Sequence, residues 1–104
     1  MKYIIPEKRM IDLVGEFIKT IEPDFSKENV AIYRGVNTDE IRYIRYYSYN
    51  KNGIFAKFFP QFSELQIEGG LFDKLKGIFS DEMEWVVQWF NREFEQEAEF
   101  LSRL

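Results

Sequence analysis

The sequence predicts one α+β domain over residues 1–104: an N-terminal helix, a three- or four-stranded antiparallel β-meander, a short helix and a long C-terminal helix packed on the sheet. Three observations predict this class. Apolar residues recur at helical spacing near both ends, the middle of the chain is rich in β-branched and aromatic residues, and Asn52-Gly53 joins two β-rich runs. A chain of 104 residues is long enough for one hydrophobic core and too short for two.

The first helix is predicted to begin at Pro6 and Glu7, because proline is tolerated at the first helical position and an acid there meets the positive end of the helix dipole. Pro23 ends it. Between these limits, apolar residues at three- and four-residue spacing form one face that we expect to lie in the core: Met10, Leu13, Val14, Phe17, Ile18 and Ile21.

Strands are predicted next, over residues 30–36, 41–49 and 54–59. Asn-Gly between β-rich runs is a strong hairpin signal because both residues accept positive φ, so the second and third strands should pair antiparallel. Pro60 stops the third strand, and the alternation around Leu65 and Ile67 predicts a short fourth strand at an edge of the sheet.

After Gly69-Gly70, residues 71–79 have the apolar spacing of a short helix. Ser80 is a suitable N-cap for the final helix, with acidic residues in its first turn. We expect that helix to run from Ser80 toward Leu104.

The final helix should carry two apolar stripes. Its core stripe comprises Met83, Val86, Val87, Phe90, Phe94, Ala98 and Leu101. At about 100° per residue, Trp85, Trp89 and Phe100 gather on another flank. Either neighbouring helices cover this flank, or it is an exposed ridge for a partner or a second copy, since Trp is enriched at interface hot spots. On the second interpretation these three rings are the partner-binding anchors, with rim charges from Glu93, Glu95 and Glu99.

An alternative function uses the sheet. Residues 30–60 hold five basic residues against two acids, and strand alternation puts Tyr43, Arg45 and Tyr47 on one face, which we expect to be exposed. With Lys57, these residues would suit a nucleic-acid-binding accessory protein, because tyrosines stack on bases and basic groups contact phosphates. The competing structural interpretation is ordinary cross-strand aromatic pairing with solvating charges.

The composition excludes several chemistries. The chain has no cysteine and no histidine, which removes disulfides, thiolate sites and histidine-based catalysis. Gly69-Gly70 lacks the lysine of a phosphate loop, and the alternating glutamates from Glu93 to Glu99 do not converge on a metal. We therefore expect no catalytic residues, no metal, no cofactor and no small-molecule substrate.

No stretch approaches the roughly 20 apolar residues of a membrane span, so we expect a cytoplasmic protein. The sequence favours a non-enzymatic protein-interaction module, such as a small regulator, an inhibitor or immunity-type protein, or an accessory subunit. We expect it to form a homodimer through the C-terminal helix or to bind another protein.

Overall fold

The computed structural model describes residues 7–26, 30–34, 39–48 and 51–104, of which the side chain of Glu7 and some side chains of the first three strands are not described. The elements in chain order are α1 (Glu7–Ile21), β1 (Val30–Arg34), β2 (Asp39–Ser48), β3 (Lys51–Phe59), the 3₁₀ turn η1 (Pro60–Phe62), β4 (Glu64–Ile67), α2 (Gly69–Phe79), the 3₁₀ turn η2 (Ser80–Glu82), α3 (Glu84–Phe94) and β5 (Phe100–Arg103).

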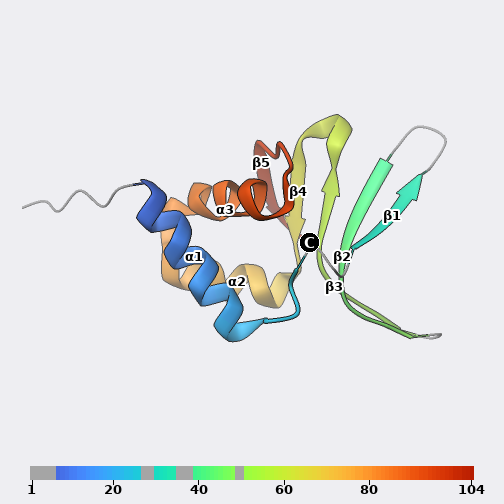
Figure 1. The fold of residues 1–104 in the computed structure, drawn as a ribbon, viewed down its shortest axis with the longest axis horizontal. Coiled ribbons are helices and arrows are strands. Elements are labelled where there is room, and N and C mark those ends of the chain that lie inside the picture. The colour runs from blue at the N-terminus through green and yellow to red at the C-terminus, as the bar shows by residue number, and fades with distance from the viewer. Residues whose placement is uncertain (1–6, 27–29, 35–38, 49–50) are drawn as a thin grey trace, which may run out of the picture.

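The fold is α+β, as predicted, with the three helices gathered on one side of a five-stranded sheet (Figure 1). The strand order is β1-β2-β3-β4-β5, and the first four strands form the expected antiparallel meander. The sheet is mixed rather than purely antiparallel because β5 pairs parallel with β4. In Figure 1, β1 lies farthest from the helices.

The predicted long C-terminal helix is wrong, because α3 ends at Phe94. Glu95 takes a left-handed conformation (φ 54°) and its N–H bonds to the carbonyl of Asn91. The Asn91 side chain then holds the turn from both sides: its Oδ1 accepts from the N–H of Ala98 (2.8 Å) and its Nδ2 donates to the carbonyl of Ala98 (3.0 Å). The chain leaves this turn as a strand.

Ser80 also differs from its prediction as an N-cap. It stands at the C-terminus of α2, where its φ is 48° and its N–H bonds to the carbonyl of Lys76. The N-cap position of α3 is Met83, which makes no side-chain cap bond. Of the acids predicted for the first turn of the final helix, Asp81 and Glu82 therefore lie in η2, and Glu84 lies in α3.

The β2–β3 pairing is antiparallel as predicted, but Asn52-Gly53 lies inside β3 rather than in the turn. Asn52 pairs with Tyr47 and Gly53 with Tyr46. The register shifts twice nearby, leaving Phe55 and Arg45 as the extra residues of two bulges. The bulge on β3 explains how Phe55 and its neighbour Ala56 are both buried despite strand alternation.

The core lies between the helices and the sheet and is strongly aromatic. Phe25, which follows α1, stacks on Phe55 with centroids 5.0 Å apart, and Tyr43 lies 4.3 Å from Phe94. Residues aligned across the middle strands, Ile41, Phe58 and Leu65, form an apolar row on the face toward the helices. This row continues to Leu101 of β5.

Candidate protein-interaction site

The expected aromatic ridge does not exist, because its three rings are in three different environments. Trp89 is only 3% exposed, whereas Trp85 is half-buried against the core and Phe100 lies on β5, not on a helix. Trp89 packs edge-on against Phe25 and Phe94, at 5.5 and 5.7 Å between ring centroids. The prediction of Trp89 as a partner anchor is therefore wrong: it is a core residue.

Helix α1 covers the flank of α3 that carries Trp89. A Cβ placed on Gly15 of α1 would lie 2.9 Å from Trp89 Nε1, so the glycine makes room for the indole. This nitrogen is buried and has no hydrogen-bond partner among the described residues. The competing interpretation of the second stripe, coverage by the first helix, is the correct one for this residue.

The predicted rim acids are dispersed as well. Glu93 is half-buried and lies 3.5 Å from Arg92 Nη2, while Arg92 Nη1 also pairs with Asp12 of α1 at 2.9 Å. Glu95 forms the left-handed end of α3. Glu99 alone stays with Phe100, because it is exposed and directly precedes β5.

The tyrosine-bearing face proposed for nucleic acid is also different from the expectation. Tyr43 is 2% exposed and faces the helices, and burial raises its pKa to about 12. The prediction that Tyr43 is exposed is therefore wrong. The side chains of Arg45 and Tyr47 lie outside the described part of the structure, and a bulge separates both residues from the register of Tyr43.

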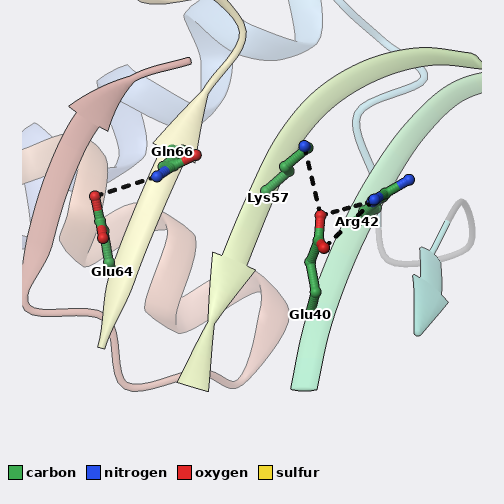
Figure 2. A network of polar contacts seen from close by, with 5 residues as sticks. All are labelled: Glu40, Arg42, Lys57, Glu64 and Gln66. Carbon is green, nitrogen blue, oxygen red and sulfur yellow. Dashed lines mark hydrogen bonds and ion pairs between the residues drawn. The ribbon is translucent and has the colours of Figure 1, made fainter. Parts of the chain in front are cut away.

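Lys57 belongs to the opposite face of the sheet, where a row of polar side chains crosses the strands (Figure 2). Glu40 accepts a 2.6 Å bond from Arg42 Nε and lies 3.6 Å from Lys57 Nζ. The hydrogen bond from Arg42 lowers the pKa of Glu40, although partial burial opposes this. Glu40 thus balances part of the positive charge that a phosphate would need.

On β4, Glu64 Oε1 accepts from Gln66 (3.3 Å; Figure 2) and from the hydroxyl of Ser102 on β5 (2.9 Å). The bond from Ser102 joins the outer faces of β4 and β5, whereas the bond from Gln66 lies within β4. β5 lies beside β4 with Ser102 on the polar face and Leu101 on the core face.

The outer edge of β5 has features expected of a docking strand. The N–H groups of Phe100 and Leu104 bond to the carbonyls of Ser63 and Ile67, at 3.0 and 2.8 Å, and so point toward β4. Because the direction of the backbone N–H and C=O groups alternates along a strand, those of Leu101 and Arg103 point away from β4, out of the open edge of the sheet. Phe100 is 61% exposed on the outer face.

A groove of about 560 Å³ runs between α2, α3 and the segment that forms β5. Its apolar lining consists of Phe72, Met83, Val87, Ala98 and Leu101, and its exposed polar lining of Lys76, Glu84, Gln88 and Glu99. Leu101 belongs both to the groove and to the edge strand, so an added segment could use the two together.

An ion pair joins the strand to α2 next to the groove. Arg103 donates from Nε and Nη2 to the two carboxylate oxygens of Asp73, at 3.1 and 3.3 Å. This hydrogen bonding lowers the pKa of Asp73 and raises that of Arg103. Both side chains remain more than half exposed, so the pair stays accessible to a further charged group.

Other chemistry is not visible in the part of the chain that the structure describes. No group of three or more acidic side chains there is arranged to hold a metal ion. None of the helices described is both long enough and apolar enough to cross a bilayer. Comparisons with protein-family models, curated proteins and solved structures find no match for this chain.

Proposed function

We propose that the chain is a non-enzymatic protein-interaction module that binds an extended segment along the outer edge of β5. The observation that carries this proposal is the coincidence, at Leu101, of outward-facing backbone groups with an apolar groove. Proteins that bind by strand addition use these two elements: main-chain hydrogen bonds supply affinity, and pockets for alternate side chains supply specificity.

The two faces of β5 would contribute differently to such binding. Toward the helices, the apolar lining of the groove can receive side chains of the added strand. On the opposite face, Phe100 is exposed and can pack on a neighbouring strand, as cross-strand aromatic pairs do. The proposal keeps Phe100 and Glu99 from the predicted site and replaces Trp85, Trp89, Glu93 and Glu95 with the groove.

The nucleic-acid alternative has less support. It depended on exposed tyrosines and on basic groups for phosphates. Tyr43 is in the core, and Lys57 has Glu40 beside it. A reducing compartment such as the cytoplasm suits a chain without cysteine, and we propose that the module acts there.

The test is to select binders from a library of displayed random peptides on the immobilised protein. Selected peptides are expected to shift the NMR resonances of residues 98–104 and of the groove lining. Arg103→Pro removes an outward N–H and should abolish their binding, whereas Arg103→Ala loses the same ion pair but keeps the N–H and should bind. Peptides that bind both variants equally, or that shift only resonances elsewhere, would refute the proposal.

A further inference from the structure

We infer that the segment occupying the β5 edge is β5 of a second copy of this chain, paired antiparallel about a two-fold axis. The inference rests on the proposed function and names its partner. A two-fold interface uses the same surface on both copies, so the strand must be complementary to itself. The sequence of β5 and the residue before it meet this condition.

Backbone geometry allows few registers. Residues whose N–H and C=O groups point outward must oppose residues of the same kind, which on β5 are Leu101 and Arg103. Leu101 can therefore oppose Leu101 of the second copy, or Arg103 of the second copy, or the two Arg103 residues can oppose each other.

Charge selects among these registers. Pairing Arg103 with Arg103 places like charges directly opposite, which destabilises a sheet. Pairing Leu101 with Arg103 sets an apolar side chain against a cation. Pairing Leu101 with Leu101 brings Glu99 of each copy opposite Arg103 of the other, which creates two ion pairs around an apolar centre.

The surroundings of these residues bear on this register. Leu101 and Arg103 are alternate residues of β5 and share the face toward the helices. Glu99 precedes the strand and its N–H bonds to the carbonyl of Ser63 at 2.8 Å, so it would meet Arg103 of the second copy through its side chain, which lines the groove with Leu101. Arg103 is held by Asp73 but remains 56% exposed, so it is already positioned at the edge when a second carboxylate approaches. On the other face, Phe100 would oppose Ser102.

Specific interfaces bury roughly 1,200 Å² or more of accessible surface in total. Pairing through a strand of four residues contributes only a small part of such an area. The expected dimer is therefore weak and depends on protein concentration. The ion pairs are exposed, so raised salt should weaken it further.

The experiment is sedimentation equilibrium over a wide concentration range, on the full chain. Wild type should self-associate, and Glu99→Arg should weaken association roughly tenfold, because each dimer then has two repulsive contacts in place of two attractive ones. Arg103→Glu should weaken it similarly. The double variant with both substitutions should recover most of the association, since the charges are exchanged and the pairs restored.

Glu97→Arg is the matched control, because Glu97 is exposed and lies outside β5 and the groove. This substitution changes the net charge by the same amount as Glu99→Arg. It should associate like wild type. A wild-type chain that stays monomeric at every concentration would overturn the inference, while peptide binding at the same edge would leave the proposed function standing. A dimer that Glu99→Arg does not weaken, or that the double variant does not restore, would overturn it too.

Discussion

Asn91→Ala tests whether one side chain sets the end of α3 and the start of β5. The substitution removes two hydrogen bonds of 2.8 and 3.0 Å that the Asn91 amide makes with the backbone of Ala98. A buried or half-buried hydrogen bond contributes about 1 kcal/mol net. Ala98 is itself buried, so its N–H and carbonyl would also lose partners that water replaces poorly.

We therefore expect Asn91→Ala to lower the free energy of unfolding by about 2 kcal/mol. For a domain of this size, that corresponds to a Tm roughly 8 °C lower or more. Chemical denaturation followed by circular dichroism measures the first quantity, and a thermal scan the second. Native-state hydrogen exchange should show the largest loss of protection at the amides of Phe100 and Leu104, which bond to Ser63 and to Ile67 of β4.

Asn91→Asp is the matched variant. Its carboxylate still accepts from the Ala98 N–H but cannot donate to the Ala98 carbonyl. The Ala98 amide should therefore lose less protection from hydrogen exchange in this variant than in Asn91→Ala. If Asn91→Ala leaves both stability and exchange at β5 unchanged, the side chain does not hold the strand and the argument for the helix end is wrong.

Three further predictions follow from the core. Gly15→Ala should lower the free energy of unfolding by about 1 kcal/mol or more, since displacing the buried Trp89 indole costs more than the gain in helix propensity. Gly77→Ala in α2, where a Cβ meets nothing within 4 Å, should raise the free energy of unfolding by up to about 1 kcal/mol. Denaturation curves of the two variants compare these values, and equal effects would contradict the close approach of Gly15 to Trp89. Trp89→Ala should cost about 3–5 kcal/mol of unfolding free energy, as a core cavity does; a folded variant of unchanged stability would return Trp89 to the surface. Burial raises the pKa of Tyr43 from 10.0 to about 12, so the folded state favours the neutral phenol; the stability it contributes is present below pH 10 and is lost as pH rises toward 12. Spectroscopic titration should show one tyrosine that ionises near pH 12, and Tyr43→Phe should remove this transition. A transition that persists in the variant would belong to another tyrosine.

Much of the fold is predictable because its signals are local. The apolar spacing in α1 and the Pro residues at its borders are short-range patterns, and the helix lies at Glu7–Ile21 as expected. The alternation that predicted the fourth strand is likewise confirmed at Glu64–Ile67, with Leu65 and Ile67 buried. Its predicted place at an edge of the sheet is wrong, because β5 pairs with the side of β4 that β3 leaves open. These elements would be recognised in almost any context.

The candidate site was predictable only in fragments. Phe100 and Glu99 were named, but as parts of a helical ridge, because Ala98 and Leu101 continue the helical spacing beyond Phe94 and the segment contains no Gly or Pro. The signal available in the sequence was Asn91, whose amide can bond to backbone and end a helix. It is weak, since its partner Ala98 lies seven residues further on.

The order of helix, meander and short helix, and the lack of histidine and cysteine chemistry, can be established from the amino-acid sequence, because periodicity, turn residues and composition do not depend on distant partners. The tertiary structure decided where α3 ends, that Trp89 and Tyr43 are enclosed, and that Phe100 stands on an edge strand. The end of α3 depends on the bonds between the Asn91 side chain and Ala98, which no helical spacing reveals. The other outcomes depend on contacts between distant parts of the chain: Gly15 with Trp89, Phe94 with Tyr43, and Ser63 with Phe100. The free energy of such contacts exceeds local helix propensity, which differs by less than about 1 kcal/mol per residue among ordinary residues.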